Sequence, residues 1–409
     1  MNQKAKILND PIYGFITIPS GLIFDIIGAP CFQRLRRIRQ LGLTFMVYPG
    51  ANHTRLQHAL GAMHLLDQAI EIIRSKGHEL TEKEAESAKI AILLHDIGHG
   101  PFSHTLEYSI IDGITHEGLS LLFMQRLNKK YDGALDIAID IFTNKYHKKY
   151  LHQLISGQLD TDRLDYLNRD SFFSGVSEGV IGADRIIKML DVVDDELVVE
   201  EKGIYSIEKF LIARRLMYWQ VYLHKTVLSS EQLLINIMKR AKELVMKGEK
   251  LFAPSHLLFF LNSDINAQNS NEEELNIILD NFILLDDSDI LSSIKEWMSS
   301  DDKILSNLSE KLINRRLFKV EMQKKPFNKQ YIKEIENESV SRYGLSDENI
   351  KYFVVKGELS NNTYSYNNEN INIKLKSGEI VDILDASDIL NMSALSKKDK
   401  KYYLCYPKF

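Results

Sequence analysis

The chain has 409 residues, which is enough for two or three domains. Hydrophobic residues make up 44% and charged residues 26%, as in an ordinary globular protein. The net charge of -5 and the pI near 6.2 argue against a nucleic acid as the main partner. The two cysteines lack metal-binding spacing and fit a reducing compartment. Because no signal peptide or membrane-length apolar run is found, we expect a cytoplasmic protein without a membrane partner.

Four segments are expected in the first hundred residues. Residues 1–30 are expected to be extended and turn structure, because Pro and Gly recur there. A short basic helix follows over residues 31–41, whose arginines either cover a solvated surface or bind an anion such as phosphate. Apolar periodicity then predicts one helix from about 54 to 76 and another from about 81 to 94.

The second of these helices runs into the ten residues from His95 to His104, which read HDIGHGPFSH. Gly and Pro at the centre of this stretch end the helix. Three imidazoles and the carboxylate of Asp96 are costly to bury without partners, and a divalent cation can satisfy several of them at once. The stretch therefore predicts a metal centre.

Further helices are expected after this motif. Residues 134–156 read as one helix, 198–205 as a short hairpin and 206–247 as one long helix. Short helices follow, and then strand patterns mixed with a helix near 329–343 and an exposed Asn-rich loop at 360–370. The expected organisation has three parts: a helical core at 1–248, a helical extension at 249–315 and an α+β region at 316–409.

Two imidazoles and two carboxylates on three predicted helices form a candidate metal-binding set: His58, His95, Asp96 and Asp162. These donors suit Fe, Mn, Zn, Co or Ni better than Mg, which prefers oxygen ligands. Four protein ligands leave room for water, which loses a proton near neutral pH on such a metal and becomes a nucleophile. Taken alone, His58 is better explained as a core histidine, and Asp162 as part of a helix covered in surface ion pairs. Only the four residues together indicate a metal site.

Other polar residues near this set suit phosphate chemistry. His99, His104 and His116 remain for phosphate contact and proton transfer, where a pKa near the working pH is useful. Three arginines are available to neutralise phosphate charge: Arg55, Arg163 and Arg214. A metal, a nucleophile, an acid and a cationic clamp together indicate hydrolysis of a phosphate ester or anhydride.

The order His58, His95-Asp96 and Asp162 resembles the signature of the HD-domain phosphohydrolases. Further strings are similar to the SAM-and-HD-domain dNTP triphosphohydrolases of vertebrates and their bacterial relatives: Gln40-Leu41-Gly42, Tyr48-Pro49-Gly50-Ala51, Arg55, Gly98 to His104, His116-Glu117 and Asp162 to Asp170. The resemblance covers residues 10–230 clearly and the C-terminal third in outline. No SAM domain is expected, because the HD region starts almost at residue 1. The resemblance implies a mainly α fold, with an HD-domain helical core and a smaller α+β C-terminal region.

The resemblance also implies roles for individual residues, beginning with metal binding by the four ligands above. A catalytic relay that serves attack on the α-phosphate and protonation of the leaving 5′-oxygen is implied for three residues: His104, Glu107 and His116. The implied substrate-binding residues are Gln40, Leu41, Arg55, His99, Arg163, Tyr166, Asp170, Arg214 and Tyr222. Among them, Gln40 and Asp170 would hold the 3′-hydroxyl. Leu41 and Tyr222 would pack against the sugar and exclude a 2′-hydroxyl.

Four positions depart from the family pattern. Glu107 stands where relatives have Asp, and Arg163 stands where the vertebrate enzyme has Lys, so the charge is kept in both cases. Leu223 replaces a Gln that touches the base, which leaves the base preference open. Gly28 replaces an Asp that reads guanine at an activator site, so a nucleotide activator is either absent or different here.

These expectations combine into one reaction, in which a dNTP and water give a deoxynucleoside and triphosphate. The cofactor would be one divalent transition metal, with additional Mg accompanying the triphosphate. One alternative is the same metal chemistry on a nucleotide monophosphate or a cyclic dinucleotide. Another is a nucleotide-sensing or nucleic-acid-binding module with a residual metal site, against which the intact relay argues. The family's habit of assembly implies a homo-oligomer, either a dimer or a tetramer.

Overall fold

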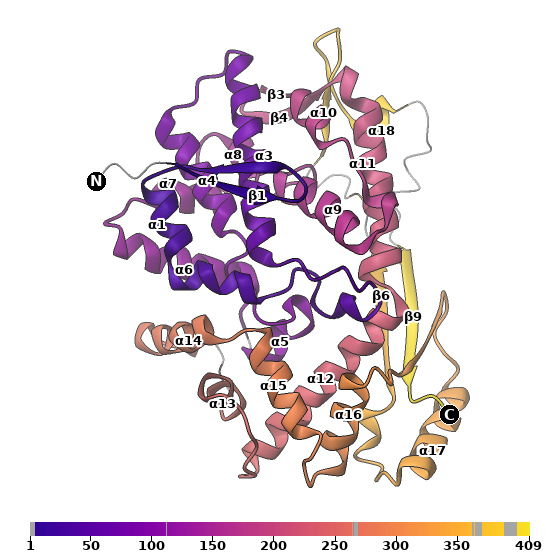
Figure 1. Cartoon of the computed structure of the whole chain (residues 1–409). Coiled ribbons are helices and arrows are strands. Elements are labelled where there is room, and N and C mark those ends of the chain that lie inside the picture. The colour runs from indigo at the N-terminus through magenta and orange to yellow at the C-terminus, as the bar shows by residue number, and fades with distance from the viewer. Residues whose placement is uncertain are drawn as a thin grey trace.

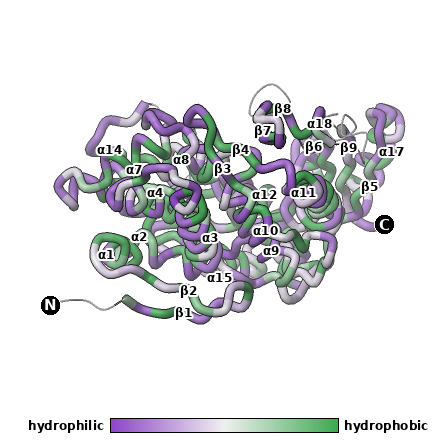
Figure 2. The backbone as a smooth tube through the Cα atoms, turned by 90° about the horizontal axis from the view of Figure 1, so that it is seen from above, coloured by the Kyte–Doolittle hydropathy of each residue, from purple (hydrophilic) through white to green (hydrophobic). Residues whose placement is uncertain are grey.

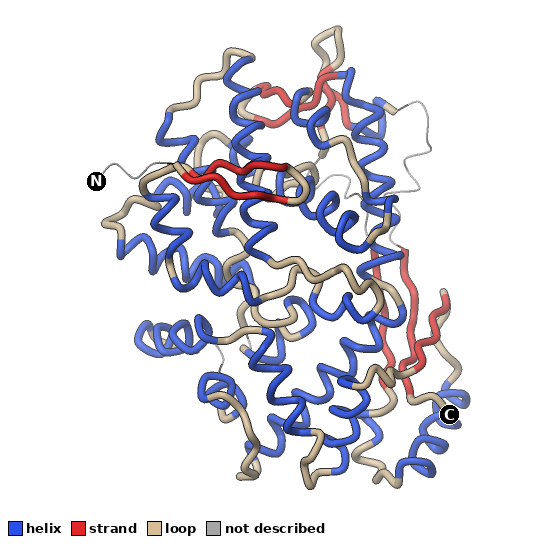
Figure 3. The backbone as a smooth tube through the Cα atoms, in the orientation of Figure 1, coloured by secondary structure: helices blue, strands red, loops and turns tan. Residues whose placement is uncertain are grey.

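The computed structural model describes residues 5–111, 113–263, 265, 269–361, 364, 370–387 and 399–409. Helices form most of this part of the chain, and its strands are confined to small sheets (Figure 3). The structure therefore has the mainly α fold with a smaller α+β C-terminal region that the sequence predicts. Within the described ranges, no helix has both the length and the apolar character needed to span a bilayer.

Three helices form the centre of the core: α3 (Arg55–Ser75), α4 (Glu82–Leu94) and α9 (Thr161–Ser174). Thr81 and Asp160 cap α4 and α9, because each side chain accepts a backbone N–H of the first turn. Helix α3 packs against both of the others. Its contact with α9 is close at Gly61, where a Cβ would lie 2.1 Å from Asp165 Oδ1. A glycine at this position lets polar side chains of α9 reach α3.

Smaller elements surround this centre (indigo to magenta in Figure 1): β1 (Lys6–Asp10), β2 (Gly14–Ile18), α1 (Leu22–Gly28), α2 (Pro30–Gln33), η1 (Arg34–Arg37), η2 (Gly42–Met46), η3 (Ser103–Thr105), α5 (Glu107–Ile110), α6 (His116–Lys130), α7 (Asp136–Phe142), α8 (Lys149–Gln153), η4 (Ser177–Gly179) and α10 (Ala183–Lys188). Residues 1–30 contain strands as expected, but also α1, whose buried Ile23 and Ile26 stabilise a helix. The single helix expected over 134–156 is wrong. It is divided into α7 and α8, and the break contains Asn144 with a φ of 57°.

The helix expected over 206–247 is interrupted in the structure. Helix α11 (Ile204–Met217) passes into a π-helix, η6 (Tyr218–Tyr222), and α12 (Lys225–Met246) starts after a short turn that ends at His224. The Nδ1 atom of His224 caps α12 by accepting a backbone N–H at 3.1 Å. No Gly or Pro marks this break, so hydrophobic periodicity alone predicts one helix. Short π-helical turns are frequent at functional sites.

The chain continues through α13 (Ser255–Leu261), α14 (Glu272–Leu284), α15 (Asp287–Trp297), α16 (Lys303–Ile313), β5 (Lys319–Gln323), α17 (Lys329–Tyr343), η8 (Ile350–Tyr352), β6 (Val355–Asn361) and β9 (Asp399–Tyr406). Strands β5, β9 and β6 form an antiparallel sheet in that order, and β5 lies along α12. The helix expected near 329–343 is α17. The Asn-rich loop expected at 360–370 lies mostly outside the described residues.

A four-stranded sheet joins the C-terminal region to the core. Its strands are β3 (Leu190–Val193), β4 (Glu196–Glu200), β7 (Asn372–Lys374) and β8 (Ile380–Asp382), in that order. Strand β7 pairs in parallel with β4, with Val199 opposite Ile373. A short helix, α18 (Ile383–Ala386), follows β8. The three-part division at 248 and 315 stays a prediction.

The core hairpin lies earlier in the chain than expected. It is formed by β3 and β4 and turns at Asp194 and Asp195, which have φ values of 51° and 61°. Two consecutive positive φ angles match the right-handed twist of a two-residue hairpin turn. The hairpin expected over 198–205 is therefore wrong, because the residues after Glu200 belong to a 3-10 turn, η5 (Glu201–Gly203), and to α11. Figure 2 shows hydrophobic and hydrophilic residues intermixed along the helices, as expected when each helix has one buried face.

Candidate active site

A cavity of about 470 Å³ lies where η2, α9, η6, α12 and the loop after α4 meet. Most residues singled out from the sequence line it: Gln40, Leu41, Arg55, Asp96, His99, His104, His116, Asp162, Arg163, Tyr166, Asp170 and Tyr222. Others lie beside lining residues instead: His58 and His95 approach Asp162, Glu107 binds His116, and the guanidinium of Arg214 lies 6.0 Å from the ring centroid of Tyr218. The fold thus gathers residues that are far apart in the sequence around one space.

The four residues predicted to bind a metal lie together. His58 Nε2 is 3.0 Å from Asp162 Oδ1 and 3.8 Å from Asp96 Oδ2. His95 Nε2 is 3.3 Å from Asp96 Oδ1 and 3.5 Å from Asp162 Oδ1. Both Nε2 atoms are buried, and neither has a hydrogen-bond partner of suitable geometry in the described part of the chain. Two orphaned imidazole nitrogens that face two carboxylates fit a divalent metal, and this mixed donor set suits a transition metal.

The electrostatics of this group also favour a bound cation. Burial lowers the pKa of His58, but the neighbouring carboxylates of Asp162 and Asp165 outweigh burial and raise that pKa to about 10. Burial raises the pKa of Asp162, yet His58 and His95 hold it well below its usual range. Positive charge placed between the imidazoles therefore stabilises the neighbouring carboxylates. A divalent metal can supply that charge in place of protons.

Arg34 holds the loop that carries His95, Asp96 and His99. Its buried guanidinium donates from Nη2 to Ile97 O and His99 O, each at 2.8 Å. Residues 31–41 do not form the single basic helix that was expected, because α2 ends at Gln33 and the 3-10 turn η1 that follows it ends at Arg37. Neither a solvated surface nor an anion site describes Arg34, whose donors bind backbone carbonyls instead.

Two further side chains fix the same loop. Ser120 on α6 donates to His95 O at 2.7 Å and accepts the Gly98 N–H at 2.9 Å. Asp287 at the start of α15 accepts the Phe102 N–H at 2.9 Å. Phe102 has a φ of 53°, which is unusual for a residue with a large side chain. The loop is therefore held rigidly enough to position neighbouring residues for different roles.

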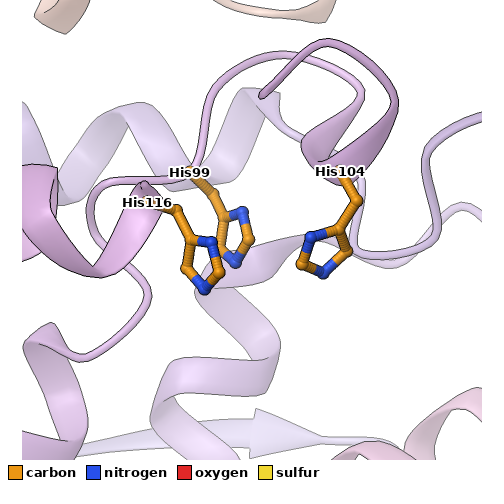
Figure 4. A group of neighbouring side chains, drawn as sticks. All are labelled: His99, His104 and His116. Atoms are coloured by element: carbon orange, nitrogen blue, oxygen red, sulfur yellow. The ribbon is translucent and has the colours of Figure 1, made fainter. Parts of the chain in front are cut away.

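Three histidines face one another at the cavity: His99, His104 and His116 (Figure 4). The rings of His99 and His116 stack with their centroids 4.0 Å apart, and His104 approaches both edge-on. Glu107 joins two of them, because Oε1 lies 2.6 Å from His116 Nδ1 and Oε2 lies 3.4 Å from His104 Nδ1. Since the carboxylate engages both Nδ1 atoms, the Nε2 atoms remain for a substrate.

The charge state of these groups suits proton transfer. Burial raises the pKa of Glu107, but hydrogen bonds from His104 and His116 outweigh burial and hold it well below its usual range. Glu107 is therefore an anion at neutral pH and favours the tautomers with a proton on Nδ1. Burial, together with the charge of Arg55, lowers the pKa of His99 well below its usual value. His99 is consequently a neutral imidazole that can donate one hydrogen bond.

The predicted phosphate-binding arginines differ in how they are paired. Arg214 is 8% exposed, and its Nε and Nη1 have no hydrogen-bond partner among the described residues. Arg55 Nη1 donates to Asp96 Oδ2 at 2.5 Å, and Arg163 Nη1 donates to Asp160. A buried guanidinium with unused donors is a strong indication of an anionic ligand. Arg214 is therefore the best-prepared of the three for phosphate.

The residues predicted to bind the sugar all line the cavity, and together they are called the sugar wall: Gln40, Leu41, Asp170 and Tyr222. Gln40 Oε1 is buried and has no partner within the described ranges. Asp170 is held from two sides, by His53 Nε2 at 2.7 Å and by the Tyr222 hydroxyl at 2.6 Å. Leu41 is partly buried against the core. Because Tyr222 belongs to η6, the π-helical turn aims it at Asp170 and into the cavity.

Asp165 is a site residue that sequence reasoning missed. It is fully buried on α9, and its Oδ2 lies 2.7 Å from His58 Nδ1. Arg169 binds both of its oxygens from the next turn of the helix, at 2.9 and 3.0 Å. A carboxylate on the second nitrogen of a metal-binding histidine fixes its orientation and tautomer. The only sequence signal was its spacing to Asp162 and Arg169, which a surface ion pair shares.

We expect Asp165→Asn to weaken metal binding by about 10- to 100-fold, because the ring of His58 loses its charged hydrogen-bond partner. Competition with a chelator of known affinity measures this effect. The control is Asp184→Asn, which changes an exposed carboxylate on α10. Thermal unfolding of both variants separates a loss of metal from a loss of fold. An unchanged metal affinity in a folded Asp165→Asn protein would show that Asp165 only balances the charge of Arg169.

Comparison with known protein families identifies two regions. The model of the HD domain matches residues 55–170, and the model of the HD associated region matches residues 181–254. The first range contains all four predicted metal ligands, and the second includes α11, η6 and the whole of α12.

Three relatives illustrate how far the similarity extends. The crystal structure of a phosphohydrolase from Bacteroides thetaiotaomicron superposes with a TM-score of 0.95 and 53% identity, over 99% of this chain and 100% of that one. An uncharacterized protein of Bacillus subtilis, YwfO, is 32% identical over 99% of this chain and 93% of its own length. The deoxynucleoside triphosphate triphosphohydrolase SAMHD1 of Homo sapiens is 29% identical over 54% of this chain, and the match spans 42% of SAMHD1. With these matches along its length, the chain belongs to the HD-domain phosphohydrolase superfamily.

Proposed function

We propose that this protein is a metal-dependent dNTP triphosphohydrolase, which converts a dNTP and water into a deoxynucleoside and triphosphate. One observation carries the proposal: the metal-binding group and the His104–Glu107–His116 relay meet at one cavity, and Arg214, a buried arginine with unused donors, lies beside Tyr218 of its lining. Similarity to the SAMHD1 homolog of Dictyostelium discoideum, at 30% identity over 67% of this chain, supports the choice of substrate. The match spans 57% of that protein, so its activity is brought to this chain as a proposal.

The reaction divides the residues by role. His58, His95, Asp96 and Asp162 would hold the metal, which when bound lowers the pKa of water and offsets phosphate charge. Arg214 would donate to the triphosphate through Nε and Nη1. Neutral His99 would donate a hydrogen bond to a phosphate oxygen. Additional Mg is expected to accompany the triphosphate.

Proton transfer is assigned to the relay. Glu107 orients His116 by accepting its Nδ1 proton at 2.6 Å, and the Nε2 atom of the ring faces the reaction. His104 is available to protonate the leaving 5′-oxygen, because its side chain is 71% exposed and its Nδ1 also lies by Glu107. An oriented imidazole serves both steps, because one ring nitrogen holds a proton while the other accepts one.

The preference for a deoxyribose is assigned to the sugar wall. Gln40 offers an unpartnered oxygen to the 3′-hydroxyl, and Asp170 adds a carboxylate that His53 and Tyr222 hold in place. Leu41 and Tyr222 leave an apolar surface where a ribonucleotide would place its 2′-hydroxyl. Burying a hydroxyl without a partner is unfavourable, so ribonucleotides are expected to be poor substrates.

The test is incubation of the purified, metal-analysed protein with each dNTP and each NTP, singly and mixed. The expected products are triphosphate and deoxynucleoside from dNTPs, with little from NTPs. Release of orthophosphate, or cleavage of a cyclic dinucleotide without triphosphate from any dNTP, would instead support another HD-type phosphohydrolase. The absence of any hydrolysis together with tight nucleotide binding would support a sensing module. A homo-oligomer, a nucleotide activator and a cytoplasmic location stay predictions.

A further inference from the structure

One acidic side chain of the cavity has no role in the chemistry above. Glu231 lies in the second turn of α12 and lines the cavity. Its Oε1 accepts a hydrogen bond from the Thr105 hydroxyl at 3.3 Å. In the described part of the chain, its side chain forms no other hydrogen bond and no ion pair. Glu231 is therefore a carboxyl group with unused acceptor capacity at a substrate-sized space.

The other carboxylates that line the cavity are engaged by cationic, imidazole or hydroxyl groups: Asp96, Asp162 and Asp170. Glu231 has only the hydroxyl of Thr105. Burial raises the pKa of Glu231 to about 7, although the bond from Thr105 lowers it. Keeping a carboxyl in such a place without a cation costs free energy, which is expected where a ligand supplies the missing donors.

The position of Glu231 indicates which part of a nucleotide it meets. The metal-binding group belongs to α3, α9 and the end of α4, whereas α12 packs against η2 and η3. A carboxyl is repelled by a triphosphate, so it is compatible only with the uncharged end of the substrate. The sugar wall is already formed by Gln40 and Asp170. Leu223, an apolar side chain suited to the flat face of a base, lines the cavity just before α12.

We propose that Glu231 reads the Watson–Crick edge of the base and favours guanine, an inference that rests on the proposed dNTP triphosphohydrolase function. Guanine presents two adjacent N–H donors, N1–H and the N2 amine, which match the two oxygens of one carboxylate. Adenine and cytosine present one amine beside a ring-nitrogen acceptor. Thymine presents one N–H between two carbonyls. In each of these three bases an acceptor faces the carboxylate and is left unpaired, which weakens binding.

The test uses the full-length protein with its metal and compares kcat/KM for dGTP, dATP and dITP, which lacks the N2 amine. We expect the native protein to prefer dGTP over both by about tenfold to a hundredfold. Glu231→Gln replaces one acceptor with a donor, so it should match adenine and reverse the preference between dGTP and dATP. It should also remove most of the difference between dGTP and dITP. The change should appear mainly in KM, because Glu231 touches no reacting atom.

Two further variants keep this test decisive. Glu231→Ala should lose the preference for dGTP without gaining one for dATP, and Glu249→Gln, an exposed residue after α12, should change nothing. Total triphosphate from a dNTP mixture reports the proposed function separately from the base ratio. If triphosphate is released but the ratios do not respond to Glu231, only the reading of the base by Glu231 is overturned. If no dNTP yields triphosphate in any variant, both proposals fail.

Discussion

Asp162→Ala is expected to lose most of its bound metal and to release triphosphate about 10³-fold more slowly than the native protein. The reason is geometric, because Asp162 Oδ1 lies 3.0 Å from His58 Nε2 and 3.5 Å from His95 Nε2. Changing a residue that only orients a metal ligand typically costs about 10- to 100-fold. Removal of a ligand that touches the metal should cost more. Elemental analysis of the purified protein and single-turnover triphosphate release measure the two effects.

The fold of the Asp162→Ala variant provides the control. In the metal-free protein, the substitution removes a carboxylate that balances the charge of His58 and His95. The metal-free variant should therefore not be more stable than the metal-free native protein. Comparison of the two proteins in chelator isolates this effect. Asp184→Ala, on the exposed side of α10, should keep both metal and activity. If the Asp162→Ala protein binds a full complement of metal and releases triphosphate at the native rate, the metal must bind at another site.

His116→Ala is expected to lower kcat by about 10²- to 10⁴-fold while leaving the metal content unchanged. His116 touches Glu107 and stacks on His99, and it lies outside the group of His58, His95 and Asp162. Its loss should therefore slow proton transfer without releasing the metal. The substrate affinity should change much less, because Arg214 and the sugar wall remain. Single-turnover kinetics at saturating dNTP, alongside elemental analysis, give both values.

Glu107→Gln tests whether His116 acts through its oriented ring. The amide removes the negative charge that holds the proton on Nδ1, so kcat should fall by less than in His116→Ala. His147→Ala, an exposed histidine between α7 and α8, serves as a matched control and should leave kcat unchanged. If His116→Ala turns over dNTP at the native rate, the relay belongs to other residues and the proposed assignment of the acid is wrong.

The sequence predicted the centre of the site because its residues have local signatures. His95 and Asp96 end an apolar helix in a Gly-rich turn, and the resemblance to a known family supplies His58 and Asp162. The fold then brings these four together through the contacts of α3 with α4 and α9. Helix α3 begins at Arg55 and ends at Ser75, within a residue or two of the expected bounds, because its apolar periodicity is strong and Gly77 follows it.

Other parts of the site lacked such signals. Asp165 and Glu231 lie on helices where an acidic residue is indistinguishable in sequence from a surface residue, and only packing shows what each one faces. The arginine-rich sequence around Arg34 predicted a solvated basic surface or an anion site, but Arg34 donates to buried backbone carbonyls. The turn at His224 contains neither Gly nor Pro, so the π-helix that aims Tyr222 was not predictable.

The pairing of β7 with β4 has a consequence for the newly made chain. Strand β4 is synthesised in the middle of the protein, but its neighbour β7 is made near the end. Until then the edge of β4 presents unpaired backbone donors and acceptors, which can pair with other chains. Contacts between such distant segments also form slowly. The nascent protein therefore depends on β7 to cover an aggregation-prone edge, and chains terminated before Asn372 would expose it permanently.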